Sequence, residues 1–338
     1  MAGRGRRRAS GVGRVGAAAL TLALLTTGCA TEAFQRPAVG PDVVWGSDEQ
    51  RSGTRSPAAT VAAATSAGVP RTGPQLPRGG HEIFPRYRLV GYAGYPGSQA
   101  LGRLGIGDLG ERMTELEQAA AGYAAGREPL PVMELIAATA HNKPQPDNTY
   151  RTHVSDEVIA AWLAMARERK ALLLLNIQPG RAKFLDEVKH FEKWLKEPDV
   201  GVALDPEWAV GPDQVPGRQF GTVPGSELND CAAYVAGIVA ANDLPEKVFL
   251  YHQLHPQIVT GERALKEHPG VVLIKSVDGI GSKNLKTATY NQLVKLTPAY
   301  VHLGFKLFFE EDTRKGEALM TPEQVLALSP QPEYVLYE

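Results

Sequence analysis

The fold is decided at Ala171–Ile177, a stretch that reads ALLLLNI. Side chains alternate between the two faces of a strand, so a run that is apolar at nearly every position is typical of a strand buried on both faces. Strands of this kind belong to parallel sheets that helices cover on either side. The stretch therefore predicts an α/β protein, with helical segments before and after it in the chain.

Strand and helix patterns alternate on both sides of this stretch. Seven further strands are expected at residues 88–93, 130–138, 200–205, 247–252, 271–277, 300–308 and 333–337. Helical spacing of apolar residues predicts helices at residues 108–123, 155–170, 181–196, 227–241, 257–267, 285–296 and 321–328. Eight strands joined by helices favour a single closed (β/α)8 barrel, a TIM-like fold of about 250 residues. An open doubly wound sheet is the alternative, but the glycine-rich Gly102–Gly107 has the wrong place and spacing for a dinucleotide-binding loop.

Residues 1–28 have the features of a lipoprotein signal peptide. Arginines without an acidic residue precede a short apolar run, Val15–Leu25, which is the pattern of a secretory signal. The run is about half of the ~20 residues that a membrane-spanning helix needs. The sequence LTTGC at Leu25–Cys29 resembles the lipobox of bacterial lipoprotein precursors. That resemblance implies cleavage before Cys29 and acylation of its thiol (palmitate), which would anchor an exported protein in the bilayer at the outer face of the cell membrane.

An ordinary signal peptide, in which Cys29 is incidental, is the alternative. Residues 29–85 are rich in Pro, Gly, Ser and Ala without apolar periodicity, so they are expected to form a flexible, disordered tether before a barrel at residues 86–338. Lys and Arg (36) balance Asp and Glu (37), and no nucleic-acid partner is expected. With Cys29 lipidated, Cys231 has no disulfide partner and is expected to be a buried structural thiol.

The predicted strands end in polar residues. Barrel enzymes build their active sites at the C-terminal ends of the strands, so these residues are expected to converge on one polar mouth. Alternation along a strand sends Asn176 and Gln178 to the same face, and likewise Asp205 and Glu207. The candidate ligand-binding residues at this mouth are Tyr92, Glu134, Asn176, Gln178, Trp208, His252, Asp278 and Lys306.

The sharpest motif is LDPEW at Leu204–Trp208. Pro206 lacks the N–H that a sheet needs, so the strand is expected to end there and leave two carboxylates and a flat ring at the mouth. Glycoside hydrolysis uses one protonated and one ionised carboxyl group. The motif is similar to the Asp-x-Glu of barrel glycosidases, notably the muramidases of glycoside hydrolase family 25. The resemblance implies Asp205 and Glu207 as the catalytic pair, with Glu207 as the acid, although the predicted first strand lacks the acidic residue of that family.

A broader resemblance joins the lipobox, the tether and the barrel to a group of exported actinobacterial lipoproteins. It is carried by Asn176–Arg181, Asp205–Trp208 and Val277–Gly279, and it implies a cell-envelope role without a particular reaction. The leading hypothesis is a membrane-tethered glycoside hydrolase, without cofactor or metal, that acts on an envelope or extracellular polysaccharide.

Other interpretations of the same residues stay open. The two carboxylates of LDPEW can instead cap a helix and pair with a basic neighbour, and Glu134 and Lys306 can form a buried ion pair across the barrel. A non-catalytic lipoprotein would use the mouth to bind a glycan or an envelope partner. A phosphodiesterase would use His141 and His252 as acid and base.

Overall fold

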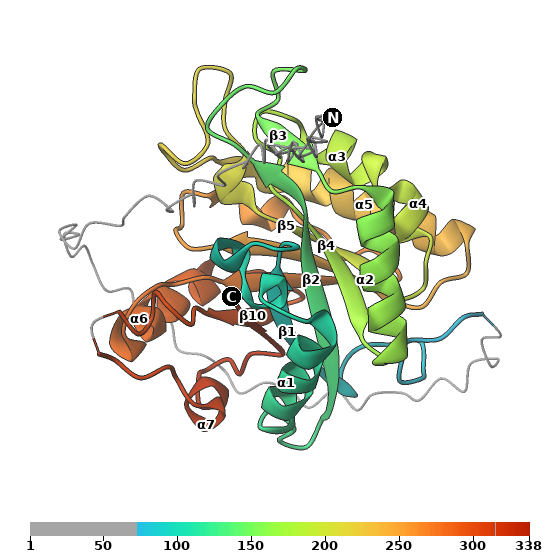
Figure 1. Ribbon diagram of the computed structural model, residues 1–338, viewed down its shortest axis with the longest axis vertical. Helices are drawn as coiled ribbons and strands as arrows, with labels where there is room; N and C mark the ends of the chain where they lie inside the picture. The colour runs from blue at the N-terminus through green and yellow to red at the C-terminus, as the bar shows by residue number, and fades with distance from the viewer. Residues whose placement is uncertain (1–72, 315) are drawn as a thin grey trace, which may run out of the picture. The chain divides into compact units, whose positions relative to one another are not determined.

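In residues 73–314 and 316–338, which the computed structural model describes, eight parallel strands close into a barrel (Figure 1). In ring order these strands are β1 (Tyr87–Gly94), β2 (Glu128–Ala140), β4 (Leu172–Ile177), β5 (Val200–Leu204), β7 (Lys247–Gln253), β9 (Val271–Val277), β10 (His302–Leu307) and β11 (Tyr334–Tyr337). Strand β1 pairs with β2 on one side and with β11 on the other, which closes the ring. The (β/α)8 barrel predicted from the sequence is therefore confirmed.

Helices between the strands cover the outside of the ring. They are α1 (Leu109–Ala121), α2 (Asp156–Glu168), α3 (Phe184–His190), α4 (Glu192–Leu195), α5 (Gly225–Ala241), α6 (Lys283–Leu293) and α7 (Pro322–Leu326). Figure 1 shows α1, α2 and α6 outside the strands. The Asp108 side chain caps α1 by accepting a hydrogen bond from a backbone N–H, and Thr321 opens α7 with a capping box. Both caps lie where the sequence predicts a helix to begin.

The barrel wall separates two apolar cores. Leu89, Val132, Leu174, Leu250 and Ile274 point inward and fill the barrel over the first part of each strand. The residues next to them in sequence point outward and pack against the helices. Because the strands keep this alternation, the sequence also fixes which residue faces inward near the C-terminal end of each strand.

The helix predicted at residues 257–267 is wrong. The segment holds the short strand β8 (Val259–Thr260) and a 3-10 turn at Glu262–Ala264. Gly261 adopts a left-handed backbone with φ 59° between them, which a continuous helix does not allow. The Glu262 side chain is buried, so the apolar spacing of this segment does not mark the core face of a helix.

Three smaller features depart from the predicted pattern. The helix expected at residues 181–196 is divided at Phe191 into α3 and α4. The strand β3 (Arg151–His153) pairs antiparallel with β2 and forms a hairpin beyond the barrel ring. The strand β6 (Val223–Pro224) pairs with β8 in a separate two-stranded sheet.

The barrel domain begins before residue 86. Leu76 and Ile83 are buried with the inner core, and the Ile83 N–H donates to Glu246, just before β7. Residues 73–85 therefore belong to the domain, which begins earlier than the predicted residue 86. Cys29, the expected signal peptide and the rest of the expected tether lie outside the described residues. Within the described ranges, no helix has the length and apolarity that crossing a bilayer requires.

The Cys231 thiol lies in α5 and is free and buried, as predicted. Burial raises the pKa of this thiol well above its usual range, because the thiolate loses the stabilisation that water provides. A protonated, inaccessible sulfur is a packing group and a poor nucleophile.

Candidate active site at the C-terminal end of the barrel

Polar side chains occupy the inward-facing positions near the C-terminal ends of the strands. Along β2, β4 and β7 the inward-facing residues change from apolar to polar: Val132 to Glu134, Leu174 to Asn176 and Leu250 to His252. We name the resulting group the barrel-mouth cluster. It consists of Glu134, Asn176, Gln178, Asp205, His252, Ser276, Asp278, Lys306 and Tyr334. None of these side chains belongs to a residue more than 5% exposed, so their charges and hydrogen bonds act on one another in a weakly screened interior.

His252 lies at the centre of the barrel-mouth cluster. Its Nε2 atom is 2.9 Å from Glu134 Oε1, and its Nδ1 atom is 2.9 Å from Asp278 Oδ2. Asp205 Oδ1 lies 3.6 Å from the same Nε2 atom. Burial opposes a charge on the ring, but the three carboxylates raise the pKa of His252 well above its usual 6.5. The ring is therefore a cation held between acids, and it is not available as a general base.

Glu134 and Asp205 form a close carboxylate pair. Asn176 Nδ2 donates to Glu134 Oε1 at 3.0 Å and to Asp205 Oδ1 at 3.2 Å. Because one nitrogen touches both oxygens, these oxygens are separated by no more than about 6 Å. Retaining glycosidases hold their two carboxyl groups ~5–5.5 Å apart, whereas inverting enzymes need ~6.5–9.5 Å. The upper limit for the two nearest oxygens of the pair is therefore below the spacing of inverting enzymes.

Glu134 is kept ionised although it is fully buried. Burial favours its protonated form, but His252, Lys306 and the Tyr334 hydroxyl favour the anion and lower the pKa of Glu134 below its usual 4.5. Tyr334 donates to Glu134 Oε2 at 2.7 Å. Its ring fits because two neighbours are glycines: a Cβ atom at Gly91 would lie 3.0 Å from the hydroxyl, and one at Gly304 would lie 3.1 Å from the ring.

Asp278 joins the histidine to Lys306. Its carboxylate accepts a hydrogen bond from Ser276 Oγ at 2.7 Å, and Lys306 Nζ lies 3.3 Å from its Oδ2 atom. Lys306 also forms an ion pair with Glu338. Glu134 forms an ion pair with His252, and Lys306 forms ion pairs with Asp278 and Glu338. The Lys306 charge also favours the Glu134 anion.

Gln178 and Thr139 extend the cluster toward the mouth. Gln178 Nε2 donates to Asp205 Oδ2 at 3.3 Å, and its Oε1 atom accepts from a backbone N–H of β2 at 3.1 Å. A bulge in β2 shifts the alternation after residue 136 and turns Thr139 inward. In the part of the chain that the structure describes, Thr139 Oγ1 and Asn176 Oδ1 are buried without a hydrogen-bond partner. Buried polar atoms of this kind are expected to meet a ligand or water.

The sequence predicts that Asp205 and Glu207 point to the same face because both continue one strand, and this premise is wrong. The strand ends at Leu204, and Glu207 and Trp208 lie in a 3-10 turn that begins at Pro206, so strand alternation does not extend to them. Both residues are buried. Glu134, which comes from β2, shares the Asn176 amide with Asp205.

Two further sequence candidates point elsewhere. Tyr92 faces the outer core, where its hydroxyl donates to Glu115 Oε1 of α1 at 3.2 Å. This follows from strand alternation, since its neighbours Gly91 and Ala93 are the inward-facing residues. His141 lies in the β2–β3 hairpin, where Nε2 is 2.7 Å from Thr152 Oγ1. Both ring nitrogens of His252 lie within hydrogen-bond distance of carboxylates, those of Glu134 and Asp278.

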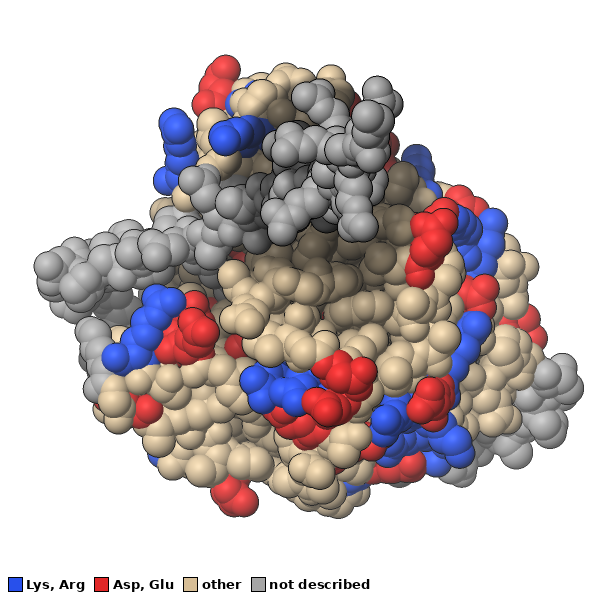
Figure 2. Space-filling model, in the orientation of Figure 1, with Lys and Arg blue, Asp and Glu red and all other residues tan. Residues whose placement is uncertain are grey.

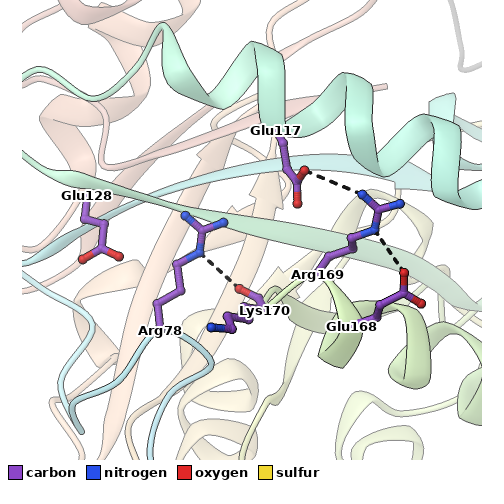
Figure 3. A pocket seen from close by; sticks show the side chains of 6 residues that line it. All are labelled: Arg78, Glu117, Glu128, Glu168, Arg169 and Lys170. Carbon is purple, nitrogen blue, oxygen red and sulfur yellow. Dashed lines mark hydrogen bonds and ion pairs between the residues drawn. The ribbon is translucent and has the colours of Figure 1, made fainter.

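The surface gives two further observations. On the described part of the face in Figure 2, basic and acidic residues are interspersed, so that face carries no large field of one sign. A pocket of about 370 Å³ is lined only by charged residues. Figure 3 shows their side chains. The lining residues are Arg78, Glu117, Glu128, Glu168, Arg169 and Lys170. Glu128 begins β2 and Lys170 precedes β4, so this pocket lies at the opposite end of the barrel from the barrel-mouth cluster.

Comparison supplies no relative from which to transfer a role. No group of three or more His, Cys, Asp or Glu residues in the described ranges is arranged to hold a metal ion. A scan of protein-family models and a search of curated proteins found no match to this chain. The geometry of the barrel-mouth cluster therefore carries the functional argument.

Proposed function

We propose that the protein is a membrane-tethered, extracytoplasmic glycoside hydrolase that acts on an envelope or extracellular polysaccharide. The observation that carries the proposal is the Glu134–Asp205 pair, in which two buried carboxylates share the amide nitrogen of Asn176 at the C-terminal end of a barrel. The tethering part of the proposal is supported by the signal-like sequence that ends at Cys29.

The two carboxylates have different environments, and this assigns their roles. Glu134 is held ionised by His252 and Tyr334, which suits a nucleophile. Asp205 accepts hydrogen bonds from the neutral amides of Asn176 and Gln178. The proposal therefore assigns the role of acid and base to Asp205, in place of Glu207.

The chemistry that follows is a double displacement. A bond forms from a Glu134 oxygen to the anomeric carbon while the glycosidic C–O bond breaks, and the leaving oxygen takes the proton of Asp205. Water then attacks the same carbon, gives its proton to Asp205 and releases Glu134. The positive His252 ring stabilises the Glu134 anion in the resting state and is not consumed.

The buried polar atoms support a hydroxylated substrate. Asn176 Oδ1 can accept a hydrogen bond, and Thr139 Oγ1 can donate or accept one. Both are buried and have no partner among the described residues. A sugar ring presents hydroxyl groups that meet both needs, which a hydrocarbon ligand would leave unsatisfied.

The test is release of reducing ends from a panel of cell-wall polysaccharides by the full chain. We compare the parent with Glu134→Gln, Asp205→Asn and Glu207→Gln, each checked for folding by circular dichroism. Activity in the parent and in Glu207→Gln, with at least about a hundredfold loss in the other two, supports the Glu134–Asp205 pair. Activity that survives both Glu134→Gln and Asp205→Asn contradicts it. Loss in Asp205→Asn and Glu207→Gln, with activity kept in Glu134→Gln, restores the pair predicted from the sequence.

A non-catalytic glycan-binding protein is the second candidate, and one observation favours it. Both oxygens of Glu134 already accept hydrogen bonds from the protein, Oε1 from Asn176 and Oε2 from Tyr334. These bonds stabilise the carboxylate and make it a weaker nucleophile. Calorimetric binding of a polysaccharide fragment without product release, unchanged in Glu134→Gln, would select this candidate. The phosphodiesterase alternative receives no support, because His252 is held as a cation between carboxylates.

A further inference from the structure

We infer that Lys286 and Asp312 form a positioning pair, which holds the Asp278 and Lys306 side chains in place beside His252. In the described ranges, neither residue forms a hydrogen bond with His252; their bonds are to the backbone beside Asp278 and Lys306. The Lys286 charge also acts directly on the Asp278 and Lys306 charges. The importance of this placement for catalysis rests on the proposed function, whereas the contacts themselves do not.

Lys286 lies in the first turn of α6, and its ammonium group is fully used. Nζ lies 2.8 Å from Asp312 Oδ2 and donates to the Lys306 carbonyl at 2.8 Å. It also donates to the Gly279 carbonyl. An ammonium group has three N–H bonds, so these three acceptors exhaust it. The residue is 1% exposed, so water does not compete for these donors.

Asp312 binds the same two segments from the other side. Its Oδ1 atom accepts from the Gly281 N–H and its Oδ2 atom from the Phe308 N–H, both at 2.9 Å. The carboxylate therefore forms hydrogen bonds with both the loop after β9 and the segment that follows β10. Together with Lys286 it fixes these segments to each other at four backbone atoms.

The fixed atoms are the immediate neighbours of two cluster residues. Gly279 follows Asp278 directly, and the Lys306 carbonyl belongs to the residue whose ammonium group pairs with Asp278. The loop is also pressed onto α6, because a Cβ atom at Gly279 would lie 2.9 Å from Thr289 Cβ. A shift of the loop would therefore move the Asp278 carboxylate, which holds His252 Nδ1 at 2.9 Å.

A buried ion pair is a costly way to gain stability alone. Removing two charges from water costs several kcal/mol per ion, and apolar replacements are often as stable. Lys286 also lies over the Phe305 and Phe308 rings at 5.2 Å, a setting that a leucine or methionine would fill. What the charged pair adds is directional bonding to four backbone atoms, which apolar side chains do not provide.

The test follows the His252 ring by NMR in the full chain labelled with 15N-histidine. The His252 signal is identified as the one that disappears in His252→Gln. The groups that face this ring are Glu134, Asp205, Asp278 and Lys306. Displacing Asp278 in Lys286→Met should lower the titration midpoint of His252, because Asp278 is its strongest charge partner. Asp312→Asn, which keeps the side-chain shape, should act in the same direction.

The matched control is Lys275→Met. Lys275 is an equally buried lysine on β9, paired with Glu262 at 2.8 Å, but it faces the outer core. Its loss should destabilise the fold to a similar degree and leave the His252 titration unchanged. If Lys286→Met does not fold, Asp312→Asn carries the measurement.

The outcomes separate this inference from the proposed hydrolase. A folded Lys286→Met or Asp312→Asn variant with the parental His252 titration overturns the positioning pair, even if the parent cleaves glycans. A shifted titration in protein that cleaves no polysaccharide supports the pair and rejects the hydrolase. Where the parent is active, the variants should also show a shifted pH profile of kcat, with KM changed less.

Discussion

His252 Nδ1 lies 2.9 Å from Asp278 Oδ2, and neither side chain is exposed to solvent. His252 lies in β7, level with Ser276 of the adjacent strand β9, and Asp278 follows directly after β9. The other ring nitrogen meets Glu134 from the opposite side of the barrel. One imidazolium therefore neutralises acids from two directions, and the charge state of the whole cluster depends on it.

Replacing His252 should expose that dependence. His252→Gln leaves Glu134 and Asp278 buried without their shared cation, and breaking a buried pair in this way costs about 3–5 kcal/mol. Urea unfolding followed by circular dichroism measures the loss in free energy of unfolding. His255→Gln is the control, because His255 is only partly buried and its loss should change stability by less than about 0.5 kcal/mol. Equal losses in the two variants would contradict a central role for His252.

The same pair makes stability depend on pH. The pKa of His252 is raised in the folded state, so its stabilising contribution is complete below pH 6.5 and declines as the pH rises through the folded pKa. The pKa of Glu134 is lowered, so its contribution is complete above pH 4.5 and declines as the pH falls through the folded pKa. Both contributions are present together between pH 4.5 and 6.5.

Unfolding free energy should therefore fall on the alkaline side in the parent and fall less steeply in His252→Gln. Urea titrations at a series of pH values measure this difference. An identical alkaline slope in parent and variant would show that the folded pKa of His252 is not raised.

Tyr334→Phe tests the hydrogen bond that holds Glu134 ionised. The variant keeps the ring but removes the 2.7 Å bond to Oε2, so the pKa of Glu134 should rise and stability should fall by about 1.5–3 kcal/mol, the range for a bond to a charged group. Tyr123→Phe is the matched control, because it removes a buried 2.6 Å bond between neutral hydroxyls of Tyr123 and Tyr337. The control should cost only about 0.5–1.5 kcal/mol. If both variants lose the same amount, the Glu134 end of the bond carries no charge.

The architecture was predictable because it follows from local patterns of apolar residues in the sequence. Continuous apolar runs such as Ala171–Ile177 mark buried parallel strands, and the alternation of inward and outward residues survives in the folded barrel. The helix predicted at residues 257–267 does not form, because Gly261 makes a turn and Glu262 bonds Lys275 of the next barrel strand, β9. Such tertiary contacts leave no periodic signal.

The candidate site was predictable only in part, for the same reason. Glu134, Asn176, Asp205 and His252 were identified because each is polar at an inward position near a strand end. Their pairing was not, since Glu134 and Asp205 meet across strands that are far apart in sequence. Tyr334 was missed because it begins its strand and reaches Glu134 only through space that two glycines leave.

Gly304→Ala tests that space directly. The added Cβ atom would lie 3.1 Å from Tyr334 Cδ1 and 3.2 Å from a backbone atom of Ser276, so overpacking should cost about 1–3 kcal/mol of unfolding free energy. Gly237→Ala is the contrasting variant: its position in α5 is exposed, with nothing within 4 Å of the added atom. It should stabilise the protein by about 0.5–1 kcal/mol, because alanine loses less backbone freedom in a helix. A neutral Gly304→Ala would mean that Tyr334 can move without cost.

The proposed lipid anchor is tested by counting thiols. The chain has two cysteines, and Cys231 is buried in α5 with its thiol kept protonated. If Cys29 is acylated, protein extracted from membranes should show one reactive thiol per chain after denaturation with a thiol reagent, and the native protein should react only as fast as it unfolds. Two thiols after denaturation would reject acylation. Cys231→Ala separates the sites, because the acylated chain should then contain no titratable thiol, whereas an unmodified chain should retain one at Cys29.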